Sequence, residues 1–100
     1  MATTTIDIGT MIVRSSDIRG GRPRIAGTGV TVQRIAELFK SGMNPDEIAS
    51  EFGHLTYAQI YAAIAYYHAN PAEIEAALAE DQAAGDRAEA DWRRSRKTTV

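Results

Sequence analysis

Cysteine is absent from this 100-residue chain, which excludes disulfides, thiolate metal ligands and cysteine nucleophiles together. No run approaches the ~20 consecutive apolar residues that a membrane span needs, and the N-terminal segment does not resemble a secretory signal. We therefore expect a cytoplasmic protein with no membrane partner. Bulky apolar residues are also scarce, because 17 of the 44 hydrophobic residues are alanine. We expect one thin core, which a dimer partner or another bound protein would help to stabilise.

Charges of one sign are concentrated in separate blocks, although the formal net charge is only −2. Residues 12–40 carry six basic and two acidic side chains, whereas residues 71–91 carry seven acidic side chains and one basic. Four further basic residues lie within residues 93–97. This segregation predicts an N-terminal surface for polyanions and a C-terminal arm for a protein partner. The alternative is that these blocks are ordinary solvated surface.

The glycine-rich stretch GRPRIAGTGV, residues 21–30, does not match a nucleotide-binding loop. A P-loop needs a lysine followed by serine or threonine after its glycine, and a dinucleotide fingerprint needs a third glycine that opens a helix; neither is present. Gly27 and Gly29 instead favour a tight turn between extended segments. The flanking arginines, which could bind phosphates, are Arg19, Arg22 and Arg24.

Capping boxes indicate where the helices begin: a small polar N-cap residue is followed three positions later by Glu or Gln. The sequences NPDE, TYAQ and NPAE fit this pattern and predict helices after Asn44, Thr56 and Asn70. Another helix is expected from about Thr31 to Gly42, where the glycine suits a left-handed cap.

The two ends of the chain give weaker patterns. MIVR and PRIAGTGVTV are rich in β-branched residues and predict two or three short strands or extended arms before the first helix. Beyond about residue 80 the apolar spacing fades and Gly85 interrupts the pattern, so we expect this segment to stay loose until a partner binds. The fold class is therefore mainly α with a short N-terminal β segment.

The helix expected at 45–52, a turn containing Gly53 and the helix from Thr56 have the spacing of a helix-turn-helix motif, although any compact helical bundle can produce it. The second of these helices contains no Arg or Lys, which favours a place at the centre of the domain or of a dimer. If it reads DNA, Gln59 could contact an adenine edge and Tyr57 a phosphate. The candidate DNA-binding residues are Arg19, Arg22, Arg24, Arg34, Thr56, Tyr57 and Gln59.

No catalytic, metal or cofactor pattern is present, so we expect a protein that is not an enzyme and has no cofactor. His54 and His68 are fourteen residues apart and have no cysteine beside them, which makes a zinc site improbable. Trp92 lies in DWRRSRK, after the apolar pattern has ended, and either anchors a partner or folds back onto its own chain. The candidate partner-binding residues are Trp92, Arg93, Arg94 and Arg96.

The ordered motifs PRIAGTGVTV, GMNPDEI and LTYAQI, within residues 20–75, resemble the small bacterial proteins catalogued as domain of unknown function 433. Those proteins typically read G-x-P-x-I-x-G-T-R-[IV]-x-V at the first motif, and this chain departs from them with Gly29 in place of arginine. The positions that match are Pro23, Ile25, Gly27, Thr28, Val30, Val32, Gly42, Glu47, Ile48, Leu55, Thr56, Ile60, Ala63 and Tyr67.

The resemblance implies a winged helix-turn-helix-like, dimeric protein, because the family is similar to such proteins and some members look like antitoxins of Vap-type pairs with PIN-like ribonucleases. We accordingly expect a homodimeric domain with an N-terminal β arm at residues 1–78, and an acidic helix with a basic tail at 79–100. The expected function is an antitoxin-like regulator that binds operator DNA and neutralises a PIN-like toxin through its C-terminal region. The alternative is a stand-alone dimeric interaction module that binds no nucleic acid.

Overall fold

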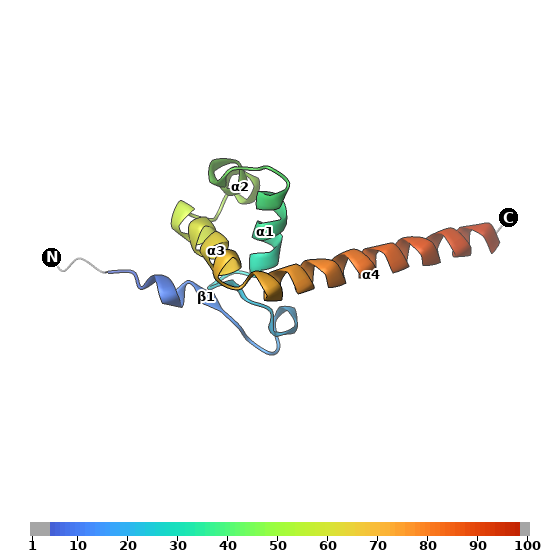
Figure 1. Cartoon of the computed structure of the whole chain (residues 1–100), viewed down its shortest axis with the longest axis horizontal. Coiled ribbons are helices and arrows are strands. Elements are labelled where there is room, and N and C mark those ends of the chain that lie inside the picture. Colours follow the sequence, from blue (N-terminus) through green and yellow to red (C-terminus); the bar gives the residue numbers. More distant parts are fainter. Residues whose placement is uncertain (1–4, 99–100) are drawn as a thin grey trace.

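The computed structural model describes residues 5–98 and is mainly helical, with a short two-stranded antiparallel sheet near the N-terminus (Figure 1). This confirms the expected fold class at that level. Residues 1–4 and 99–100, which the expected divisions 1–78 and 79–100 also include, lie outside the described residues. The elements are η1 (Ile8–Thr10), β1 (Ile12–Val13), η2 (Arg19–Gly21), β2 (Arg24–Ile25), α1 (Val32–Lys40), α2 (Pro45–Phe52), α3 (Tyr57–Ala69) and α4 (Pro71–Thr98).

Local capping chemistry sets the ends of α1, α2 and α3. The capping boxes predicted at Asn44 and Thr56 both form, so α2 and α3 begin where the sequence indicates. Thr31 caps α1 by accepting a hydrogen bond from the Arg34 amide. Gly42, at φ +105°, ends that helix as predicted, and its amide donates to the carbonyl of Phe39.

The third expected box, at Asn70, does not form, although α4 begins at Pro71 as predicted. The Asn70 side-chain amide donates to the Tyr66 carbonyl, and both Glu73 carboxylate oxygens are engaged elsewhere, by Arg14 and by the Tyr66 hydroxyl. Glu73 thus makes a charge-assisted hydrogen bond with Arg14 and a hydrogen bond with Tyr66 instead of one with the backbone at its own helix start. Tertiary contacts have therefore replaced the local motif.

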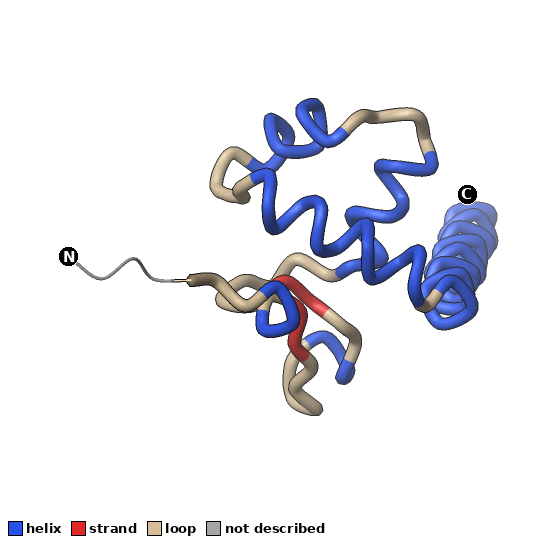
Figure 2. Tube along the Cα trace, turned by 60° about the vertical axis from the view of Figure 1, so that its left-hand side comes forward, coloured by secondary structure: helices blue, strands red, loops and turns tan. Residues whose placement is uncertain are grey.

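The core lies where α1, α2 and α3 meet above the sheet (Figure 2). Isoleucine fills most of it, and the largest fully buried side chains are Ile25, Ile35, Ile48, Ile60, Ile74 and Val32. Helix α3 is central but not enclosed, because the exposed side chains on one of its faces include Tyr57, Ala58, Tyr61, Ala65 and Ala69. This uncharged face is bare in the single chain.

Helix α4 packs on the body only through its first turns, where Ile74 is fully buried and Leu78 is half-buried. We call residues 82–98 the arm: every described side chain from Gln82 to Arg96 is exposed, and the arm projects away from the body (Figure 1). The expectation of a loose chain from about residue 80 is wrong in one respect, because the segment is helical to Thr98 although no side chain from Gln82 to Arg96 packs on the body. Alanine-rich sequence and side-chain pairs four residues apart, such as Glu89 with Arg93, offset the cost of about 1 kcal/mol for Gly85.

Within the described part of the chain, no helix combines the length and the apolar character that crossing a membrane requires.

Candidate nucleic-acid and partner interfaces

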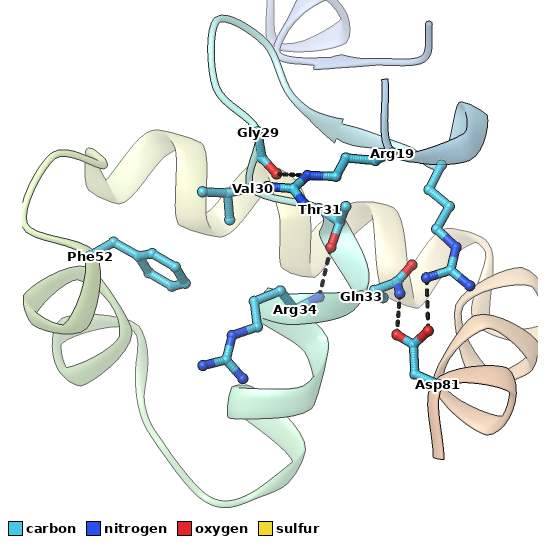
Figure 3. Close-up of a pocket in the computed structure, with 9 residues that line it drawn as sticks. Arg19, Gly29, Val30, Thr31, Gln33, Arg34, Phe52 and Asp81 are labelled. Carbon is cyan, nitrogen blue, oxygen red and sulfur yellow. Dashed lines mark hydrogen bonds and ion pairs between the residues drawn. The ribbon is translucent and has the colours of Figure 1, made fainter. Parts of the chain in front are cut away.

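An open cavity of about 530 Å³, here called the arginine cavity, lies beside the start of α1 (Figure 3). Phe52 and the Arg34 side chain lie on one side of it, and Gln33 and Asp81 lie on the other. The cavity is lined by residues from the turn after β2, the first turn of α1, the end of α2 and the inner part of α4. The residues that line it are Arg19, Arg22, Gly29, Val30, Thr31, Gln33, Arg34, Phe52 and Asp81.

A left-handed turn directs Arg19 into this cavity. Arg19 has φ +51°, a backbone conformation that non-glycine residues rarely adopt, and it is followed by two glycines that also have positive φ. Its Nε donates to the carbonyl oxygen of Gly29 at 3.1 Å. Arg19 lines the cavity, so its positive charge is available there. The unusual backbone conformation of Arg19 is what places the side chain at this position.

The other two candidate arginines near the glycine turn differ from Arg19. Arg24 is only 8% exposed, and its guanidinium donates to the Thr28 carbonyl and to Ser15 Oγ, so it holds the turn together from inside. Arg22 donates from Nη1 to Asp81 at 2.9 Å and from Nη2 to Glu80 at 3.2 Å. Arg24 is therefore not presented to a ligand, and Arg22 is already paired with carboxylates of α4.

Arg34 completes the cavity from the outer face of α1. Its side chain is about half exposed and is 3.6 Å from the Glu37 carboxylate, a contact of the kind that contributes little in water. Among the described residues, no carboxylate of α4 forms an ion pair with Arg19 or Arg34. These two arginines are the cations of the cavity that keep binding capacity for an anion.

The basic block of the sequence and the acidic block meet along the first turns of α4. Arg14 pairs with Glu73, and Lys40 binds both carboxylate oxygens of Glu75 at 2.8 Å. Arg14, and then the Tyr66 hydroxyl, hold the pKa of Glu73 below its ordinary value. Lys40, and then Tyr67, do the same for the pKa of Glu75. Together with Arg22, three of the six basic side chains in residues 12–40 are thus paired with carboxylates of α4.

Two of the candidate DNA-binding residues at the start of α3 lie at a second, more open hollow. Thr56 and Tyr57 line it, and Tyr57 is exposed. The Thr56 hydroxyl and the Gln59 side-chain oxygen are both used in the capping box, which leaves the Gln59 NH₂ group for any further contact. Phe52 lines the arginine cavity and Gly53 lines this hollow, so consecutive residues at the end of α2 contribute to the two sites.

The candidate partner-binding residues share the outer end of the arm. Trp92 is 59% exposed, so it does not fold back onto the body, and the Arg96 guanidinium lies 5.2 Å from its ring centroid. Arg93 pairs with Glu89 at 2.6 Å, and Arg94 pairs with Asp91. The arm therefore presents an aromatic side chain surrounded by basic residues that already have partners on the same helix.

Three residues of the arginine cavity were not identified from the sequence: Gln33, Phe52 and Asp81. Gln33 is buried and donates from Nε2 to Asp81 at 2.5 Å, a contact between residues 48 positions apart that no local pattern indicates.

Neither of the two histidines lines the cavity: His54 contacts the Phe52 carbonyl, and His68 packs on the edge of Phe39. In residues 5–98 no group of three His, Cys, Asp or Glu side chains is placed to hold a metal ion.

The described chain is thus a small helical body that carries an arginine-lined cavity and a projecting helical arm. The family described as protein of unknown function (DUF433) matches residues 12–67, more than half of the chain, and the chain belongs to this family. The crystal structure of a DUF433 member protein from Anabaena variabilis ATCC 29413 is similar, with a TM-score of 0.65. The two are 28% identical over 69% of this chain and 68% of that chain. No curated protein matches the chain.

Proposed function

We propose that this protein is an antitoxin-like regulator whose body binds operator DNA as a winged helix-turn-helix-like homodimer. Its C-terminal region neutralises a PIN-like ribonuclease. The bare, uncharged face of α3 supports the homodimer, because a helix that is apolar on all sides is ordinarily covered on all sides.

The observation that carries this proposal is the exposed arm. Residues 82–98 form about 25 Å of helix, in which no side chain from Gln82 to Arg96 packs against the body, and such a helix gains little stability of its own. An exposed tryptophan among arginines is the composition that anchors protein interfaces. A partner protein that receives the arm would explain both the missing tertiary contacts and the aromatic residue at its outer end.

Inhibition would follow from the charge of the arm. A ribonuclease with an acidic metal site binds cations and the phosphates of its substrate. Arg93, Arg94 or Arg96 could occupy the place of the cation or of the substrate contacts once the partner's carboxylates replace Glu89 and Asp91. Trp92 would fix the position of the helix on the toxin surface.

Operator binding would use the arginine cavity and the start of α3. Arg19 and Arg34 would neutralise backbone phosphates, with Tyr57 and the free amide group of Gln59 nearer the bases. We leave Arg24 out of this set, because its guanidinium is buried.

Deletion of residues 91–100 tests the arm. RNA cleavage by a PIN-like ribonuclease encoded in the adjacent reading frame is measured in the presence of the full chain, the deletion variant and Arg87→Ala. The proposal expects full inhibition by the intact chain and by Arg87→Ala, and lost inhibition by the deletion variant. Unchanged neutralisation by the deletion variant would show that the arm mechanism is wrong.

The second candidate is a dimeric interaction module that binds no nucleic acid. It is favoured by the pairing of Arg14, Arg22 and Lys40 with carboxylates of α4, which leaves few free cations. A gel shift with the protein's own upstream DNA separates the two candidates. Specific binding that weakens steeply with salt supports the regulator, and no binding at low salt supports the module.

A further inference from the structure

Asp81 of α4 occupies an anion-binding position at the wall of the arginine cavity. Its Oδ1 accepts a hydrogen bond from Arg22 Nη1 at 2.9 Å, and its Oδ2 accepts from Gln33 Nε2 at 2.5 Å. Two donors from different elements thus hold the two oxygens of one carboxylate (Figure 3). A carboxylate and a phosphate present the same kind of paired acceptor oxygens to arginine.

Gln33 makes this position a preformed site. It is only 5% exposed, so its side chain is fixed by packing, and its Oε1 has no hydrogen-bond partner in the described structure. The amide orientation follows from chemistry, because only the NH₂ group can donate to a carboxylate. Only the NH₂ group of Gln33 serves an anion, and its contact with Asp81 shows that this buried donor reaches a carboxylate oxygen at the cavity wall.

The cavity has more cationic capacity than Asp81 uses. Arg19 and Arg34 line the same space, and in residues 5–98 neither forms an ion pair or a hydrogen bond with Asp81. The Asp81 side chain is 51% exposed and the Arg22 side chain is 31% exposed, so solvent and ions reach their contact. An exposed pair of this kind is held weakly, and an incoming anion can exchange with it.

We propose that Arg22 and Gln33, with Arg19 and Arg34 beside them, form a binding site for a phosphate group, and that Asp81 is its internal occupant. The phosphate displaces the Asp81 carboxylate from Arg22 and Gln33, and it competes with Glu80, which pairs with Arg22 Nη2 at 3.2 Å. Its assignment to a DNA backbone rests on the proposed function, whereas a free phosphate would use the same chemistry. Because Asp81 belongs to the same chain, its effective concentration is high and phosphate binds weakly until Asp81 leaves.

The test compares Asp81→Ala with Asp86→Ala in the full chain. Both variants remove one carboxylate from α4, but Asp86 hydrogen-bonds to Gln82 on the arm and does not line the cavity. Asp81→Asn, which keeps the side-chain shape, is a second variant, and far-UV circular dichroism checks the helix content of all three. Affinity for a labelled random-sequence DNA duplex is measured at several salt concentrations.

The expected result is specific to Asp81. Asp81→Ala binds the duplex roughly fivefold to tenfold more tightly than Asp86→Ala at about 0.1 M salt, and its salt slope is steeper by about one, the value for one additional phosphate contact. Adding Arg22→Gln to Asp81→Ala removes the gain. Titration with inorganic phosphate, at matched ionic strength in chloride, shifts the Gln33 side-chain amide signals in Asp81→Ala and not in Asp86→Ala.

Two results overturn the inference: equal duplex binding by the two variants, or Gln33 signals that do not respond to phosphate in Asp81→Ala. A third result separates it from the proposed function. If Gln33 responds to phosphate but the wild type and all variants fail to bind any duplex at low salt, the site stands as one for free phosphate and the DNA-binding function is wrong.

Discussion

The guanidinium of Arg19 lies across Gly29: Nε donates to the Gly29 carbonyl oxygen at 3.1 Å, and Nη2 is 3.2 Å from the point where a Cβ on residue 29 would stand. The family motif places an arginine at this position of the chain. Here the side chain is missing from residue 29, and a guanidinium reaches the same place from η2. The departure from the motif therefore does not remove positive charge from the cavity.

Substitution of Gly29 tests this relationship. In Gly29→Ala the new methyl group meets the end of a flexible side chain, so the free energy of unfolding changes by less than about 0.5 kcal/mol while Arg19 is displaced. Arg19→Gln removes the guanidinium itself, and if Arg19 contacts a phosphate the salt slope of duplex binding falls by about one in this variant. Gly29→Ala, which moves the guanidinium by only a few tenths of an ångström, should keep the wild-type slope. An unchanged slope in Arg19→Gln would show that Arg19 contacts no phosphate.

Acid should destabilise the attachment of α4. The ordinary pKa of Glu73 and Glu75 is 4.5, and partners in the folded state lower it. A lowered pKa contributes stability that is present above the unfolded value and is lost as pH falls through the folded value. Urea denaturation should therefore show stability decreasing below about pH 4.5. Glu73→Gln with Glu75→Gln should flatten this dependence, and a wild-type slope in the double variant would contradict it.

Ile74 and Trp92 lie on one helix but should differ in their effect on folding. Ile74 is fully buried at the base of α4, so Ile74→Ala is expected to lower the free energy of unfolding by about 2–5 kcal/mol. Trp92→Ala should change it by less than about 0.5 kcal/mol, because the side chain is exposed on the arm. Urea denaturation measures both, and a large loss in Trp92→Ala would mean that the arm packs on the body.

Hydrogen exchange should divide α4 in two. The side chains of residues 82–96 are all exposed, so the amides of this segment should exchange much faster than those of Ile60 and Ile64 in α3. Amides next to Ile74 should exchange with the body. Protection of the arm in the free protein equal to that of α3 would exclude an unpacked arm.

Local chemistry was predictable from the sequence, and long-range pairing was not. Asn44, Thr56 and Gly42 act within four residues of their own positions, so their patterns gave the helix ends. The box at Asn70 failed because Glu73 found Arg14, 59 residues away. The basic and acidic blocks could be seen in the composition, but their pairing with each other could not, and the composition instead favoured a polyanion and a protein as their partners.

The candidate site was predicted in part for the same reason. Arginines near the glycine turn were recognisable, but burial of Arg24 and the strained turn that presents Arg19 depend on how the turn packs. Gln33 and Asp81 carry no local pattern, and their contact exists only because α4 passes α1. The arm was underestimated, because helix formation there depends on many small side-chain pairs rather than on apolar spacing.

Helix α4 also joins its two halves mechanically. No break in the helix separates Asp81 at the cavity from Trp92 on the arm, and eleven residues of helix correspond to a rod of about 16 Å. A protein that binds Trp92 and tilts the arm would therefore also move Asp81. Gly85, the residue of lowest helix propensity between them, is where the helix would bend. Such a movement would change the hydrogen bonds of Asp81 with Arg22 and Gln33 without any contact between the bound protein and the body.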